Sequence, residues 1–150
     1  MTTSTMAEAG TEHEMRIELE RRISAPIEDV WEAMLHEIGP GFGGENDEPL
    51  HMKVEPFPGG RWYRDLGDGT GHLWGHVQAI RPHTLFELTG PLFMSAPVSN
   101  NVQYRLAHQD GVTTLRFVHT AFGPLPEDLR DGMLEGWGDI LDKVEHRAGG

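Results

Sequence analysis

His119 and Tyr104 are the two side chains whose chemistry could serve a reaction inside an apolar interior. His119 closes an alternating segment whose inward side also carries Thr113, Leu115 and Phe117. An imidazole changes charge near neutral pH and can transfer a proton, so His119 could act as a polar group at the mouth of a cavity. The alternative, which we favour, is a core histidine hydrogen-bonded to a neighbouring backbone carbonyl. Both interpretations stay open, and we expect binding rather than catalysis.

The nine histidines do not form a metal site that the sequence can identify. His72 and His76 have the most regular spacing, but on a strand they stand roughly 13 Å apart, at about 3.3 Å per residue. Two ligands of one zinc each lie about 2.0–2.1 Å from it, so this pair cannot share an ion. Cysteine is absent, and no nucleophile elbow, P-loop or dinucleotide-binding motif occurs. The sequence therefore predicts no metal and no cofactor.

Large apolar side chains form the candidate ligand-binding set. As core residues they need no further explanation, whereas as the wall of a cavity they suit a flat, apolar guest. We expect a cavity of a few hundred Å³ between a long helix and a sheet, walled by Trp62, Phe86, Tyr104, Phe117, Trp137 and Leu141. The complete candidate set is Trp62, Trp74, Phe86, Phe93, Tyr104, Phe117, His119, Trp137 and Leu141.

The helix that would cover this cavity runs from Pro126 to about Arg147. Its apolar arc at helical spacing comprises Leu129, Met133, Leu134, Trp137, Ile140, Leu141 and Val144. Gly132, Gly136 and Gly138 border the arc, and each glycine destabilises a helix by about 0.5–1 kcal/mol against alanine. Close approach of the sheet would explain them, and this is the explanation we favour. The alternative is that the missing side chains leave a hollow beside the helix.

The remaining elements read as strand, short helix and six further strands. Met15–Ile23 alternates apolar and charged residues, and an amphipathic helix follows, with Ser24 as its cap, Pro26 in its first turn and Gly39 at its end. The six strands are expected at His51–Phe57, Arg61–Leu66, His72–Ile80, Thr84–Thr89, Asn101–His108 and Val112–Thr120. Short glycine-containing turns join them, which predicts an antiparallel meander. Whether Leu73 or Trp74 faces inward stays open.

The order β-α-β6-α predicts an α+β fold, a curved antiparallel sheet wrapped around a long C-terminal helix. The 150 residues suit a single domain, which we place at residues 14–147 after a disordered tail at residues 1–13. A formal net charge of −12 argues against nucleic-acid and membrane partners. No stretch has the pattern of a secretion signal or a membrane span, so we expect a cytoplasmic protein.

Four segments carry a resemblance to a known superfamily: EPFPGGRWY, GHLWGHVQAIRPHTLFEL, TTLRFVHTAF and EGWGDIL. They resemble the START-like (SRPBCC, Bet v 1-like) superfamily, and within it the branch of Hsp90 ATPase activator homologues. The resemblance implies a helix-grip fold with a hydrophobic cavity between the sheet and the long helix. It fixes no function, because the same fold serves carriers, cyclases, hydrolases and co-chaperones.

The segments GGRWY, VHTAF and RDGMLEGWGDIL are also similar to the self-sacrifice resistance proteins of enediyne producers, of which the calicheamicin protein is the type. That resemblance implies hydrogen abstraction from a backbone glycine, for which Gly90 in the segment LTGPLFMSAPVSNN is the candidate cleavage site.

Three functions follow from these readings. The first is non-catalytic binding of a hydrophobic, aromatic or polyketide-like small molecule. The second is antibiotic self-resistance by sequestration or self-sacrifice. The third, by resemblance alone, is interaction with an Hsp90-type chaperone partner.

Overall fold

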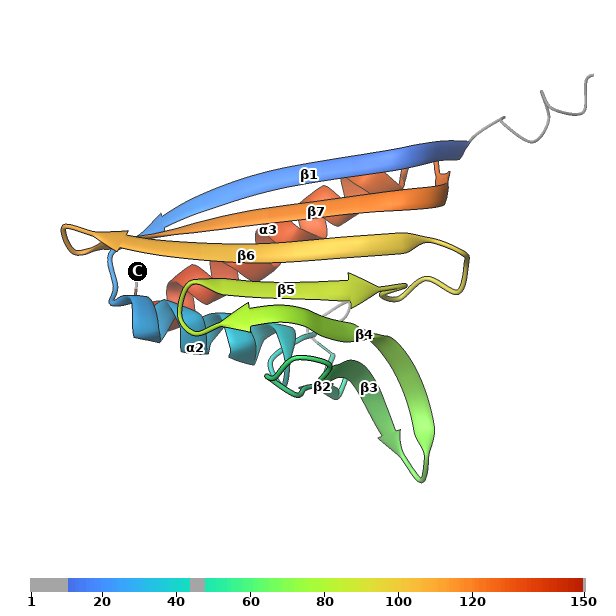
Figure 1. The fold of residues 1–150 in the computed structure, drawn as a ribbon, viewed down its shortest axis with the longest axis horizontal. Helices are drawn as coiled ribbons and strands as arrows, with labels where there is room; N and C mark the ends of the chain where they lie inside the picture. Colours follow the sequence, from blue (N-terminus) through green and yellow to red (C-terminus); the bar gives the residue numbers. More distant parts are fainter. Residues whose placement is uncertain (1–10, 44–47, 150) are drawn as a thin grey trace, which may run out of the picture.

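A computed structural model describes residues 11–43 and 48–149 of the chain. Seven antiparallel strands form one curved sheet in the order β1-β7-β6-β5-β4-β3-β2, and two helices cover one of its faces (Figure 1). The elements are β1 (Thr11–Ile23), α2 (Ile27–Ile38), β2 (Met52–Val54), β3 (Arg61–Gly67), β4 (Thr70–Arg81), β5 (Leu85–Gly90), β6 (Ser99–Gln109), β7 (Val112–Pro126) and α3 (Leu129–Ala148). The predicted α+β helix-grip fold is confirmed.

The short helix α2 lies where the hydrophobic spacing predicts it. Its apolar stripe, which includes Val30, Met34 and Ile38, is buried against the sheet. Gly39 ends the helix, and its N–H donates to the carbonyls of the last turn. The predicted cap is wrong: Pro26 is the N-cap and no side chain caps the helix. Pro26 fixes an extended backbone at the N-cap, and Ser24 lies two residues before it.

Several element boundaries differ from the prediction, among them the start of β1 and the junction of β7 with α3. β1 begins at Thr11, so residues 11–13 of the expected tail belong to a strand, and residues 1–10 lie outside the described residues. β7 continues to Pro126, pairing with the start of β1, so α3 begins at Leu129 instead of Pro126. Leu125 is buried in this extension of β7. Burial of its side chain favours continuing the strand to Pro126 over starting the helix there.

A β-bulge settles which side chain of β4 faces inward. Trp62 pairs with Gly75 and Tyr63 pairs with Leu73, which leaves Trp74 as the extra residue. Trp74 is 8% exposed and Leu73 is 44% exposed, so the tryptophan turns toward the helices. A bulge re-aims a side chain without ending the strand. Alternation alone could not reveal this, since one extra residue inverts the pattern.

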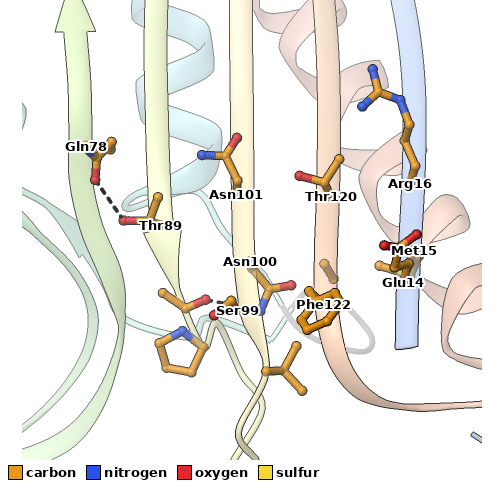
Figure 2. A pocket seen from close by; sticks show the side chains of 14 residues that line it. Glu14, Met15, Arg16, Gln78, Thr89, Ser99, Asn100, Asn101, Thr120 and Phe122 are labelled. Carbon is orange, nitrogen blue, oxygen red and sulfur yellow. Dashed lines mark hydrogen bonds between the residues drawn. The ribbon is translucent and has the colours of Figure 1, made fainter. Parts of the chain in front are cut away.

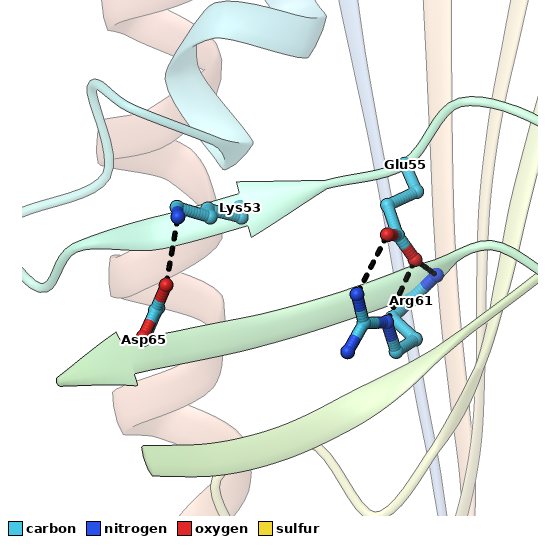
Figure 3. Close-up of polar contacts among 4 residues, drawn as sticks. All are labelled: Lys53, Glu55, Arg61 and Asp65. Carbon is cyan, nitrogen blue, oxygen red and sulfur yellow. Dashed lines mark hydrogen bonds and ion pairs between the residues drawn. The ribbon is translucent and has the colours of Figure 1, made fainter. Parts of the chain in front are cut away.

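An ion pair between Glu55 and Arg61 holds the turn before Trp62. Glu55 accepts hydrogen bonds from the Nε and Nη2 of Arg61 and from its backbone N–H, each at 2.8 Å (Figure 3). These bonds lower the pKa of Glu55 to about 2. Gly60 fits inside the turn because a Cβ there would lie 1.9 Å from the Glu55 carbonyl oxygen. The turn therefore places Trp62 at a fixed point under the helices, and the predicted strand His51–Phe57 ends at Val54.

Candidate functional site

A small apolar pocket of about 170 Å³ lies between α3 and the bulged region of β3 and β4. Aromatic rings dominate its wall, and the two tryptophans of the sheet meet edge to face with centroids 5.2 Å apart. Its lining residues are Phe42, Trp62, Trp74, Leu92, Phe93, Gly132, Met133, Gly136, Trp137 and Ile140. Because this wall is almost wholly apolar, the pocket suits a hydrophobic group better than a polar one.

Two of the pocket's tryptophans are held by hydrogen bonds and one is not. The Nε1 of Trp62 donates to the Ile38 carbonyl at 2.8 Å, which ties β3 to the end of α2. The Nε1 of Trp137 donates to His119 at 3.0 Å. The Nε1 of Trp74 is buried and has no hydrogen-bond partner among the described residues. The pocket wall thus combines fixed rings with one buried, unsatisfied donor.

The helix glycines leave space for the pocket and do not serve to bring the sheet close to the helix. Apart from the neighbouring backbone of α3 itself, a Cβ added at Gly132 or Gly136 would meet no described atom within 4 Å, and at Gly138 the nearest is the Nη2 of Arg21 at 3.9 Å. Close approach of the sheet, the explanation favoured from the sequence, is therefore wrong. Gly132 and Gly136 lie one turn apart and both line the pocket, so their missing side chains leave its mouth open.

The structure divides the predicted ligand-binding set. Trp62, Trp74, Phe93 and Trp137 line the pocket, and Phe93 is 44% exposed at its rim. The other apolar members do not line it, because they lie deeper in the core with no exposed surface: Phe86, Tyr104, Phe117 and Leu141. The Tyr104 hydroxyl is buried and has no hydrogen-bond partner in the described part of the chain, and burial raises its pKa. A phenol so placed has no neighbour to exchange a proton with, which argues against a catalytic Tyr104.

His119 sits in a buried chain of hydrogen bonds. Trp137 Nε1 can only donate, so His119 Nδ1 accepts and Nε2 carries the proton. That Nε2 lies 2.8 Å from Asn100 Oδ1, and Asn100 Nδ2 donates to the Gly90 carbonyl at 3.1 Å. Burial lowers the pKa of His119 to about 4. His119 is thus a neutral core histidine bonded to two side chains, a third arrangement beside the two considered from the sequence.

Gly90, the candidate cleavage site, has a packing reason to be glycine. Its φ is +154°, and a Cβ there would lie 2.4 Å from the Trp74 carbonyl oxygen. Gly90 does not line the aromatic pocket. It lines a groove of about 1000 Å³ on the opposite, helix-free face of the sheet (Figure 2). A reagent that reached Gly90 through this groove would therefore approach from the outer face.

Several residues of the site were not predicted from the sequence to belong to it. Asn100 could have been found from the sequence, because it lies two residues before Val102 and four before Tyr104. It therefore shares their inward-facing side of β6 and is a buried polar residue. Met133 and Ile140 belonged to the predicted apolar arc of the helix without being assigned to a cavity. Leu92 has a positive φ of 58° and its N–H donates to the Trp74 carbonyl. Nothing in the sequence singled out Phe42 or Leu92.

Among residues 11–43 and 48–149, no group of three or more potential ligands is placed to hold a metal ion. Within the same ranges, no helix has the length and apolar character that a membrane crossing requires.

Comparisons with known proteins give one family model by sequence and several solved structures with the same fold. The family model described as Activator of Hsp90 ATPase homolog 1-like protein matches residues 24–149. No curated protein matches the chain by sequence. Protein MLL2253 from Mesorhizobium loti superposes with a TM-score of 0.69 at 23% identity, covering 89% of this chain and 96% of that one.

Two further solved structures share the fold. CalU16 from Micromonospora echinospora has a TM-score of 0.65 at 19% identity, covering 93% of this chain and 83% of that one. DynU16, a protein of the dynemicin biosynthetic locus, has a TM-score of 0.63 at 20% identity, covering 90% of this chain and 46% of that one.

Proposed function

This chain belongs to the family of Activator of Hsp90 ATPase homolog 1-like proteins, and from that premise we propose that it binds a hydrophobic small molecule without catalysis. An aromatic ring of the ligand inserts between Trp62, Trp74 and Trp137. The single observation that supports this most strongly is the open apolar space beside the helix glycines Gly132 and Gly136. Each glycine weakens the helix, and a binding space accounts for that loss of stability.

The pocket's volume limits what it accepts. A dry engineered cavity of about 150 Å³ is known to hold one benzene molecule, and this pocket measures about 170 Å³. One ring therefore fits, whereas whole ligands usually occupy about 300–1,000 Å³. A polycyclic or polyketide-like molecule would insert one edge and leave the rest over Phe93 at the rim.

The hydrogen bonds of His119, beside the pocket, favour ligand binding over catalysis. His119 contacts the pocket wall through Trp137, and both of its ring nitrogens are engaged. A general base needs a free lone pair within reach of the substrate proton, and the Nδ1 lone pair of His119 already accepts from Trp137. We therefore assign His119 to holding the Trp137 indole in place.

Isothermal titration calorimetry with indole and 1-naphthol tests this proposal. We expect both to bind the full chain, and we expect Gly136→Leu to abolish binding because its side chain fills the pocket. Asp139→Leu is the matched control, since it adds the same side chain to an exposed position of α3. Equal binding by all three proteins, or none by the wild type, would contradict the proposal.

Enediyne self-resistance is the second candidate function. The shared fold of DynU16 from the dynemicin locus favours it, because dynemicin is an enediyne. The chain would either sequester the antibiotic or give up the Cα hydrogen atom of Gly90 to the activated diradical. In the second case dioxygen adds to the resulting carbon radical, and the oxidised backbone breaks there. Incubation with a reductively activated enediyne followed by intact-mass analysis separates the two, since only sacrifice yields fragments ending near Gly90. An Hsp90-type chaperone partner rests on the family resemblance alone.

A further inference from the structure

The sheet face turned away from the helices carries a second hollow, of about 470 Å³, beside the groove that contains Gly90. The two share Arg16, Asn101 and Thr120. Figure 2 shows these three side chains on neighbouring strands, in line with Thr89. The name outer hollow is used here for the set Arg16, Glu18, Asn101, Gln103, Arg105, Arg116, Val118 and Thr120. We propose that the outer hollow binds a small oxyanion, a phosphate or carboxylate group.

Three arginines meet in the outer hollow although the chain as a whole is strongly acidic. Arg16, Arg105 and Arg116 come from β1, β6 and β7, in a chain with 12 cationic and 24 acidic side chains. Arg105 and Arg116 are directly opposite each other in the β6–β7 register. Like charges in that position repel and destabilise a sheet. A bound anion would turn this repulsion into attraction.

The carboxylate inside the outer hollow does not neutralise all three arginines. Glu18 Oε1 accepts from Arg16 Nη2 at 3.1 Å and from Arg116 Nη2 at 3.3 Å. Arg105 takes part in no ion pair among the described residues, and its Nε donates to the Gln103 amide oxygen at 3.3 Å. Its terminal nitrogens stay available as donors. Arg105 is therefore the residue on which the binding of an oxyanion should depend most.

Neighbouring side chains are already held in place. Glu87 Oε2, from β5, accepts from Asn101 Nδ2 at 2.7 Å and from Gln103 Nε2 at 3.0 Å. Gln103 in turn accepts from Arg105, so the guanidinium is oriented before any ligand arrives. A planar guanidinium matches the geometry of carboxylate and phosphate oxygens. The hollow thus offers charge together with preorganised donors.

The test compares three full-length proteins with millimolar inorganic phosphate, and with acetate as a carboxylate, at ionic strength matched by chloride. We expect both anions to raise the unfolding temperature of the wild type and of Arg22→Gln, which removes an exposed arginine from β1 outside the outer hollow. Arg105→Gln should bind at least about tenfold more weakly, because a hydrogen bond to a charged group is lost. A response to one anion alone would assign the outer hollow to that group.

Nuclear magnetic resonance of the arginine Nε–H groups locates the anion. Phosphate should shift the Arg105 and Arg116 signals and leave that of Arg22 in place. Without anion, Arg105→Gln should unfold at the same temperature as the wild type or higher, since the like-charge pair is gone. Equal anion responses in all three proteins, or shifts confined to arginines outside the outer hollow, would overturn the proposal.

Discussion

Acidification should destabilise the fold through His119 by a predictable amount. The side chain is fully buried, and burial lowers its pKa from 6.5 to about 4. The unfolded chain therefore binds a proton on this residue below pH 6.5, and the folded chain does not until about pH 4. The contribution of His119 to the free energy of unfolding is complete above pH 6.5 and is lost as the pH falls toward 4.

The size of this loss follows from the two pKa values. At pH 5 the linkage relation gives about 2 kcal/mol relative to pH 7.5, and the limit below pH 4 is about 3 kcal/mol. Other groups also titrate: the pKa of Glu18 and that of Asp65 are lowered by their cationic partners, and Glu55 by Arg61. Those carboxylates stabilise the fold above their unfolded pKa, which is 4.5 for the two glutamates and 3.8 for Asp65. A measurement at pH 5 keeps their contribution small.

Urea unfolding of the wild type and of His119→Gln at pH 7.5 and pH 5 isolates the effect. We expect the wild type to lose about 2 kcal/mol more than the variant over this interval. A long-range ¹H–¹⁵N spectrum of the wild type needs no variant and should show protonated Nε2 and bare Nδ1 at pH 7.5. Equal losses in both proteins, together with an imidazole that titrates near pH 6.5, would refute the burial argument.

Three further substitutions test the packing. Gly136→Ala should stabilise the fold by about 0.5–1 kcal/mol and raise the urea midpoint, since no described atom outside the nearby backbone of α3 lies within 4 Å of the new Cβ; a lower midpoint would show that the sheet touches the helix. Gly90→Ala should destabilise the fold by about 1–3 kcal/mol, because its Cβ would collide with the Trp74 carbonyl; calorimetric melting showing no loss would contradict this geometry. Trp62→Phe should cost about 1–3 kcal/mol in urea unfolding, as it leaves the Ile38 carbonyl without its donor; an unchanged midpoint would argue that water replaces it.

The element order could be predicted from the sequence because periodicity and turn residues are local signals. The helix Ile27–Ile38 has its apolar stripe at helical spacing, and the hairpin at Asp110-Gly111 has the expected turn dipeptide. The boundary between β7 and α3 could not be predicted in this way. Pro126 suits both a helix start and a strand end, and pairing with β1 decides for the strand.

The candidate site could be predicted only in part, for a physical reason. Alternation tells which side of a strand faces inward, and so it identified Phe117 as an interior residue, whereas Trp62 was expected inside as one of the large aromatic side chains. It does not tell where along the strand the covering helix leaves space. Phe117 lies under Trp137 with ring centroids 4.7 Å apart and is sealed in the core, whereas Trp62 lies where the helix glycines open the pocket. That difference depends on the placement of α3, a long-range property.

The location of a bound ring tests the central proposal most directly. A crystal of the full chain soaked with 4-bromophenol would reveal the bromine by its anomalous scattering. We predict a peak inside the pocket, among Trp62, Trp74 and Trp137, that is missing from crystals of Gly136→Leu. A bromine bound only elsewhere on the molecule, or an empty pocket in a crystal of a protein that binds 4-bromophenol in solution, would contradict the proposal.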